Sequence, residues 1–252
     1  MSILDIFLWG VLPYVVVVIL VGGTIWRYKY DQFGWTTRSS QLYESKILKI
    51  ASPLFHYGLV GVFAGHVVGL LIPASWTAAM GISNDAYHLG ALVMGIPFGI
   101  AVVIGLAVMI FRRRTNKSVF AATTWNDKLM YVALMVVIVL GIAVTIISAI
   151  QGHHGHNYRA DVSPWFRSLF IFQPQVELMR DIPWEFKAHI LLALALFALW
   201  PFTRLVHAFT APFHYLFRPY IVYRSRGGER PGSRRGWDPV GTQDRSHIGY
   251  YK

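Results

Sequence analysis

Five long apolar stretches dominate this 252-residue sequence. They cover approximately residues 3–26, 47–72, 88–111, 128–150 and 184–210. A helix needs about 20 apolar residues to cross the hydrocarbon core of a bilayer, and each stretch is at least that long. A helix also satisfies its backbone hydrogen bonds within one segment, as lipid requires. The sequence therefore predicts an all-α, polytopic membrane protein with five transmembrane helices, here called spans one to five.

Cysteine is absent from the chain, and this limits the cofactors it can hold. Without cysteine the chain forms no disulfide, binds no iron–sulfur cluster through thiolates, and attaches no haem covalently through a Cys-x-x-Cys-His motif. Any redox centre must then be held by histidine or belong to a partner protein.

Basic residues give the chain a net charge of +11, and they gather in alternate loops. They are frequent between spans one and two, between spans three and four, and after span five, but absent between spans two and three. The positive-inside rule then predicts an N-terminus outside and a cytoplasmic C-terminal tail, with no role in binding nucleic acid. Arg112, Arg113, Arg114 and Arg218 are interpreted first as topology signals and second as partners of haem propionates. Span one lacks a basic n-region and a cleavage site, so we expect a retained helix.

Two regions outside the spans differ in character. We assign residues 1–225 to the membrane domain and residues 226–252 to a basic tail, which is either solvated or ordered against a soluble partner or the anionic lipid surface. The loop 151–183 predicts a short amphipathic helix at the outer interface. Its apolar residues are Trp165, Phe166, Phe170, Ile171 and Phe172.

Two spans carry two histidines each: His56 and His66 in span two, and His189 and His207 in span five. An ionisable side chain in hydrocarbon is expensive, so it marks a functional site by default. Four imidazoles on two helices can supply the axial ligands of two b-type haems. The glycines around them have two interpretations, close helix packing or space for a porphyrin.

The expected depth of each histidine in the membrane groups the four residues into two pairs. His56 and His66 lie about 14 and 28 Å from the cytoplasmic start of span two, and His189 and His207 about 8 and 35 Å from the outer start of span five. This pairs His66 with His189 near the outer face and His56 with His207 near the inner face. Eighteen residues are five turns, which also predicts His189 and His207 on one face. The axial separations differ, at about 15 against 27 Å, so a kink at Pro201 would have to absorb the difference.

The remaining histidines are weaker candidates. His88, at the outer edge of span three, is either an interfacial residue at a helix start or a quinol contact and proton acceptor. His153, His154 and His156 are expected in a solvated turn rather than a metal site. We expect His214 at the interface and His247 in solvent.

Several short motifs together resemble one family, the gamma subunit of membrane-bound respiratory nitrate reductase. The resemblance covers about residues 3–225. Its motifs are Pro13-Tyr14, Arg27-Tyr28, Phe55-His56-Tyr57-Gly58, Gly65-His66-x-x-Gly69, Lys187-x-His189, Arg204-x-x-His207 and the segment from Phe213 to Arg218.

The resemblance implies a dihaem cytochrome b anchor in a prokaryotic inner membrane. Menaquinol or ubiquinol would be oxidised near the outer haem of His66 and His189. Electrons would pass through the inner haem of His56 and His207 to a cytoplasmic iron–sulfur beta subunit and a molybdenum alpha subunit that reduces nitrate to nitrite. Family members place a lysine in the loop between spans two and three. Residues 72–87 here contain no Lys or Arg, which leaves Gly65, His66 and His88 as quinol-site candidates.

Two alternatives stay open. One is the cytochrome b anchor of another quinone-linked complex, such as a hydrogenase, a formate dehydrogenase or a heterodisulfide-type enzyme. The other is a transporter or proton channel that uses the membrane histidines as relays. The sequence shows neither the inverted repeat nor the paired broken helices typical of transporters.

Overall fold

The computed structural model describes residues 2–36, 38–152, 155–210 and 217, and these residues form helices but no strands. Five helical segments among them are long and apolar enough to cross a membrane: Ile3–Tyr30, Leu48–Leu71, Asn84–Thr115, Trp125–Gln151 and Trp184–Phe202. The predicted all-α architecture with five spans is therefore confirmed. The compact unit ends at Thr210, so the predicted boundary at residue 225, the tail 226–252, His214, Arg218 and His247 lie outside the described residues.

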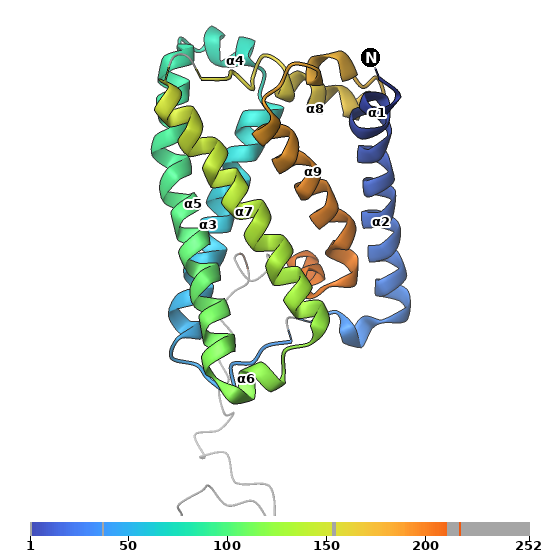
Figure 1. Ribbon diagram of the computed structural model, residues 1–252, viewed down its shortest axis with the longest axis vertical. Coiled ribbons are helices and arrows are strands. Elements are labelled where there is room, and N and C mark those ends of the chain that lie inside the picture. Colours follow the sequence, from blue (N-terminus) through green and yellow to red (C-terminus); the bar gives the residue numbers. More distant parts are fainter. Residues whose placement is uncertain (1, 37, 153–154, 211–216, 218–252) are drawn as a thin grey trace, which may run out of the picture. The chain divides into compact units, whose positions relative to one another are not determined.

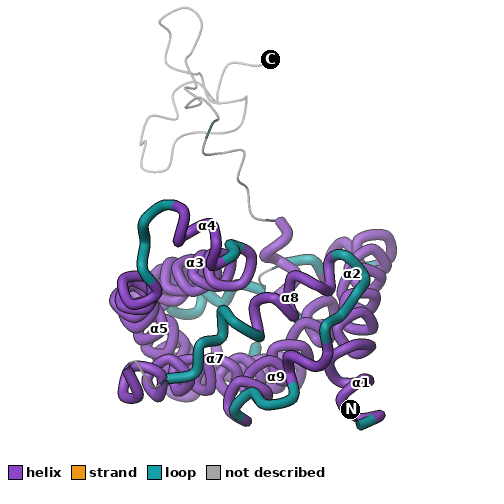
Figure 2. Tube along the Cα trace, turned by 90° about the horizontal axis from the view of Figure 1, so that it is seen from above, coloured by secondary structure: helices purple, strands orange, loops and turns teal. Residues whose placement is uncertain are grey.

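The long helices run side by side along one direction, and short helices lie at their two ends (Figures 1 and 2). Span one consists of α1 (Ile3–Ile6), a π-helical turn (Phe7–Val11) and α2 (Leu12–Tyr30). The other long helices are α3 (Leu48–Leu71), α5 (Asn84–Thr115), α7 (Trp125–Gln151) and α9 (Trp184–Leu199). The short ones are α4 (Ala74–Ala79), α6 (Lys117–Ala121), α8 (Val162–Phe170) and 3-10 turns at Gln32–Gly34, Val176–Met179, Trp200–Phe202 and Arg204–Thr210.

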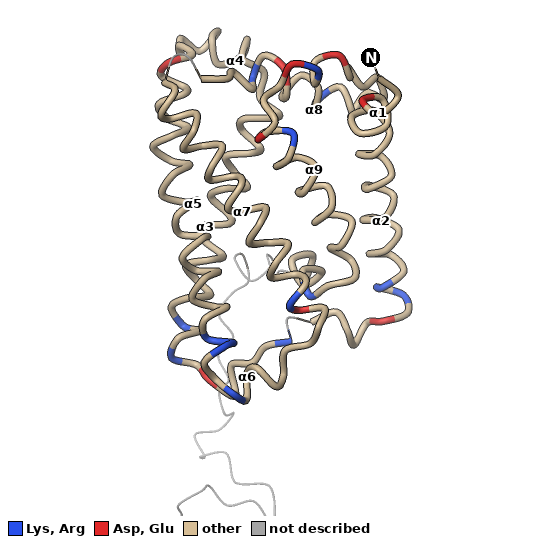
Figure 3. The backbone as a smooth tube through the Cα atoms, viewed as in Figure 1, with Lys and Arg blue, Asp and Glu red and all other residues tan. Residues whose placement is uncertain are grey.

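Charged residues gather at the two ends of the bundle (Figure 3). We call the end with residues 31–47 and α6 the basic end, and the end with α4 and α8 the α8 end. Between them the side chains are mostly apolar, with a few polar residues such as the histidines of α3 and α9. The main core there contains Phe55, Val102, Leu106, Met130 and Leu134 from α3, α5 and α7.

Helices α3 and α5 pack closely because glycines face the other backbone. A Cβ at Gly105 would come 2.6 Å from the backbone nitrogen of Phe55, and one at Gly58 would come 3.0 Å from the backbone nitrogen of Val102. Neither position tolerates a side chain without a shift. For Gly58, beside His56, the packing interpretation of the small residues therefore holds.

At the α8 end, side chains of α8 satisfy carbonyl groups that prolines leave free. Pro13 has no N–H for the carbonyl of Trp9, and this carbonyl accepts a 2.9 Å hydrogen bond from Nε1 of Trp165. Pro73 likewise leaves the carbonyl of Gly69 free, and Oγ of Ser163 donates to it at 2.9 Å. The predicted helix in loop 151–183 is thus present, and its Trp165 is buried against Trp9 of span one.

Span five is not one helix, which differs from the prediction for residues 184–210. The α-helix ends at Leu199, the next turn is 3-10, and Thr203 is extended with φ −115° and ψ 179°. Pro201 accounts for the break because it donates no hydrogen bond and its ring clashes with the carbonyl four residues earlier. His189 and His207 therefore do not share a face of a continuous helix.

A buried arginine from span one holds this break. Nη1 of Arg27 donates to the carbonyls of Pro201 and Thr203 at 2.7 and 2.9 Å, and Nη2 donates to the carbonyl of Gly34 at 2.7 Å. Its Nε lies 3.1 Å from the carboxylate of Asp31. Carbonyls that cannot reach water need such donors.

Further arginines at the basic end, Arg112, Arg113 and Arg204, also have buried rather than solvated side chains. The side chain of Arg112 is 2% exposed and donates to Oγ and the carbonyl of Ser40 and to Glu44. Burial opposes ionisation of Glu44, but the N–H of Ile47 and the guanidinium of Arg112 hold its pKa below the usual value. Arg204 forms a bidentate pair with Asp127, with nitrogen–oxygen distances of 2.8 and 2.6 Å. Arg112 is therefore a structural contact of residues 31–47.

We expect Arg27→Met to lower the free energy of unfolding by about 2–4 kcal/mol, because three buried carbonyls lose a charged donor. Unfolding of the detergent-solubilised chain, followed by circular dichroism, measures this. Lys29→Met is the matched control, since Lys29 is exposed on the same helical turn and should change stability little. Equal stability of the two variants would contradict the role of Arg27.

Candidate paired-histidine sites

The first ring pair lies toward the basic end. His56 on α3 and His207 on the turn after the break have ring centres 6.3 Å apart, with an angle of 67° between the rings. Nδ1 of His56 lies 2.7 Å from the carbonyl of Ser52, and Nδ1 of His207 lies 2.5 Å from the carbonyl of Arg204. A carbonyl partner fixes the proton on Nδ1, so Nε2 of each ring keeps its lone pair.

The second ring pair lies toward the α8 end. His66 on α3 and His189 on α9 have ring centres 6.2 Å apart, with an angle of 33° between the rings. Nδ1 of His66 lies 2.8 Å from the carbonyl of Val62, so Nε2 is again the free acceptor. The carbonyl of Val137 on α7 approaches the ring of His189, but the buried Nδ1 makes no hydrogen bond of normal geometry.

The separation of the rings distinguishes two arrangements. A direct hydrogen bond between two imidazoles would place their centres roughly 5 Å apart. Two metal–nitrogen bonds of about 2 Å each, with ring centres about 1.1 Å behind the bonding nitrogens, place the centres roughly 6.2 Å apart. The distances of 6.2 and 6.3 Å match the second arrangement. Both pairs therefore fit the axial ligands of a haem iron.

A glycine on α7 makes room for the ring of His189. A Cβ at Gly141 would come 2.8 Å from Cε1 and 3.4 Å from Nδ1 of that ring. Gly141 could not be singled out from the sequence, because α7 carries no candidate ligand and one glycine in an apolar span has no motif around it. Gly65, next to His66, has no neighbour within 4 Å of its Cβ position, so that face of α3 is open.

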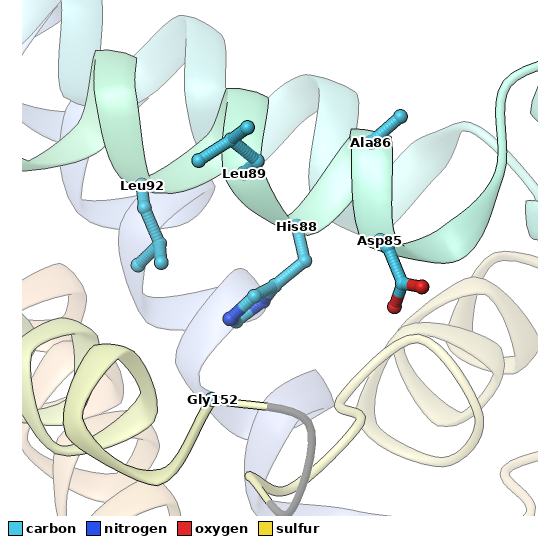
Figure 4. A pocket seen from close by; sticks show the side chains of 6 residues that line it. All are labelled: Asp85, Ala86, His88, Leu89, Leu92 and Gly152. Carbon is cyan, nitrogen blue, oxygen red and sulfur yellow. The ribbon is translucent and has the colours of Figure 1, made fainter.

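His88 lies in the first turns of α5 and points toward Gly152 at the end of α7 (Figure 4). It lines a cavity of about 380 Å³ together with Asp85, Ala86, Leu89, Leu92 and Gly152. Its Nε2 is buried and has no hydrogen-bond partner. The imidazole of His88 is therefore available to a ligand in this cavity.

The predicted histidine cluster of the following loop is described only at His156. Its Nε2 lies 3.0 Å from a carboxylate oxygen of Asp161, and both side chains are 21% exposed. His153 and His154 lie outside the described residues. Within the described part of the chain, no group of three or more His, Asp or Glu residues could hold a metal ion.

The model of the family described as nitrate reductase gamma subunit matches residues 5–226. This chain belongs to that family. The nitrate reductase gamma chain of Bacillus subtilis is 45% identical over 219 residues, which are 87% of this chain and 97% of the relative. The respiratory nitrate reductase 2 gamma chain of Escherichia coli K12 is 35% identical over 224 residues, which are 88% of this chain and 98% of the relative.

Another similar protein is longer. The nitrate reductase-like protein NarX of Mycobacterium tuberculosis H37Rv is 54% identical over 232 residues, 91% of this chain but 35% of that protein. The chain thus spans about a third of NarX. The family confirms the resemblance drawn from the histidine motifs. Together with the five spans, it identifies a multi-pass prokaryotic inner-membrane protein.

If His189 holds a haem iron, Gly141→Ala should displace its ring and lower the haem content toward one per chain. The added methyl group would lie 2.8 Å from Cε1, closer than ordinary contact. A pyridine haemochrome assay of the purified chain measures the haem. Gly22→Ala is the control, because no atom lies within 4 Å of a Cβ there. Full haem content with an unchanged spectrum in Gly141→Ala would refute the prediction.

Proposed function

We propose that this chain is the dihaem cytochrome b subunit of a quinol-dependent nitrate reductase. The observation that carries the proposal is the separation of the two ring pairs, 6.2 and 6.3 Å, which suits two imidazoles bound to one iron. Membership of the nitrate reductase gamma subunit family favours nitrate reductase over a hydrogenase, formate dehydrogenase or heterodisulfide-type complex.

In this proposal His66 and His189 hold an outer haem b, and His56 and His207 hold an inner haem b. A bound haem supplies a one-electron carrier whose potential depends on its axial ligands and burial. The chain orients three of the rings through Nδ1 contacts to carbonyls, and Gly141 leaves space for the fourth. These contacts present Nε2 to the metal before it binds.

Quinol oxidation is proposed at the α8 end, which the positive-inside rule assigns to the outer face. Oxidation of a quinol to a quinone releases two electrons and two protons. Gly65, His66 and His88 remain the candidate contacts. Of these, His88 offers a buried Nε2 without a hydrogen-bond partner, positioned to accept a proton from a quinol hydroxyl in the cavity beside it.

The basic end is the proposed docking face for the soluble subunits. Exposed cations there include Lys46, Lys49, Arg114 and Lys117, which would attract an acidic partner surface. The proposed partners are a cytoplasmic iron–sulfur beta subunit and a molybdenum alpha subunit, in which nitrate is reduced to nitrite. The basic tail 226–252 is proposed on the same cytoplasmic side.

We expect two b haems per purified chain, and the loss of one in each axial-ligand variant. His66→Ala and His189→Ala should lose the same band of the reduced-minus-oxidised spectrum, and His56→Ala and His207→Ala the other. Each variant removes one of the two bonds that hold its iron. Optical spectroscopy with haem quantification measures both results.

His156→Ala is the matched control, because among the described residues this ring contacts Asp161 and Phe186 and no histidine ring, and it should keep both haems. A folded wild-type chain without haem would contradict the cytochrome proposal. Loss of the same band in His66→Ala and His207→Ala would contradict the proposed pairing of the histidines.

A further inference from the structure

A second, more polar cavity of about 180 Å³ shares lining residues with the cavity beside His88, and the two cavities are here called arms. Asp85, His88 and Gly152 line both arms. The first arm continues along Ala86, Leu89 and Leu92, and we call it the apolar arm. The second arm, here called the polar arm, adds Asn84, Tyr87, Ala91, Gly155, His156, Asn157, Tyr158 and Arg159.

Arg159 is the residue of the polar arm whose surroundings leave most unexplained. It is 7% exposed. Nη2 donates to Oγ1 of Thr77 at 2.9 Å, and the guanidinium carbon lies 3.7 Å from the centre of the Tyr87 ring. Nε and Nη1, however, are buried without a hydrogen-bond partner. Buried guanidinium nitrogens without acceptors are costly, so this arrangement calls for an oxygen ligand in the polar arm.

The phenol of the neighbouring Tyr158 does not supply a negative charge for Arg159. Burial and the hydrogen bond with Tyr87 raise the pKa of Tyr158, so that its hydroxyl stays neutral. His156 contacts Asp161 at 3.0 Å, which makes that carboxylate part of another pair. The two unpartnered nitrogens of Arg159, a residue that lines the polar arm, therefore receive no anionic acceptor from these neighbours.

The polar arm lies next to the ring pair of His66 and His189. A Cβ at Gly69 would come 3.0 Å from the hydroxyl of Tyr158, so Tyr158 rests on α3 at that glycine. Gly69 follows His66 by three residues, which places both on the same face of α3, with Gly69 nearer the α8 end. A ligand bound by Arg159 would thus sit beyond the outer ring pair rather than at the basic end.

The two arms together define the chemistry of the ligand. The polar arm offers donors at Arg159 and, at His88, a buried Nε2 that makes no hydrogen bond. The apolar arm suits a hydrocarbon body. We propose that Arg159 binds a headgroup oxygen of the quinol, while His88 contacts a hydroxyl of the same headgroup. This inference rests on the proposed function and assigns its substrate a residue outside the predicted candidates.

The test uses the intact complex in membranes and menadiol as the quinol. The initial rate of haem reduction is measured against menadiol concentration, and dithionite gives the total reducible haem. Arg159→Gln should raise the half-saturating menadiol concentration by about tenfold or more, because a charged hydrogen bond to the ligand is lost. Its haem content and dithionite-reduced spectrum should equal those of the wild type. Arg159→Lys, which keeps the charge on a single flexible donor, should fall between them.

Arg167→Gln is the matched control. Arg167 on α8 donates from Nη1 to the carbonyl of Leu70 at 2.9 Å and does not line either arm. It should keep the wild-type menadiol dependence. The inference is overturned by a wild-type dependence in Arg159→Gln, by an equal shift in Arg167→Gln, or by loss of haem in Arg159→Gln, which would make Arg159 structural. Failure of the proposed function looks different: the wild-type complex would then lack haem, or its haem would accept electrons from dithionite but not from menadiol.

Discussion

The contact of Arg27 with the broken end of span five is the interaction on which the arrangement of the ring pairs depends. On continuous helices, His56 and His66 are about 15 Å apart along the axis and His189 and His207 about 27 Å. The two axial separations differ, so two straight helices could bring only one of the two histidine pairs to the same depth. The break after Leu199 removes the mismatch, and it leaves carbonyls at Pro201, Phe202 and Thr203 that Arg27 and Asn126 satisfy.

The α8 end uses the same physical device with different donors. Trp165 and Ser163 donate to carbonyls that Pro13 and Pro73 leave free, and Arg167 donates to the carbonyl of Leu70. Lipid offers no water to such groups, so each donor fixes one element against another. Both ring pairs therefore lie between elements whose ends are held by bonds from side chains to the backbone. This rigidity suits a site that must keep two rings at a metal-bridging distance.

Hydropathy and helical rise were enough to predict the five spans. In lipid, a single apolar segment satisfies its own backbone hydrogen bonds by forming a helix. The histidines that depth pairs in the sequence are also neighbours in the structure, while their binding of iron stays a prediction. The end of α9 could not be located, because Pro201 permits either a kink or a break. The contact that accompanies the break, from Arg27 to the carbonyl of Pro201, joins residues far apart in the sequence.

The sequence also gave no signal for Gly141 or Arg159. Gly141 matters through a ring on a different helix, and in the sequence Arg159 is an isolated basic residue of the loop 151–183 with no motif around it. Its burial comes from Thr77 and Tyr87, which are more than 70 residues earlier in the chain. The loop 72–87 lacks the cation expected from the family, and Arg159 brings one to the same end of the bundle from another segment. Only contacts between distant segments reveal residues of this kind.

A cryo-electron microscopy map of the detergent-purified, haem-loaded complex tests the central claim most directly. The account predicts two planar densities, one between His66 and His189 and one between His56 and His207, each bonded through Nε2 on both faces. A haem bonded to any other pair of residues, or a ring pair joined directly by a hydrogen bond with no density between the rings, would contradict it.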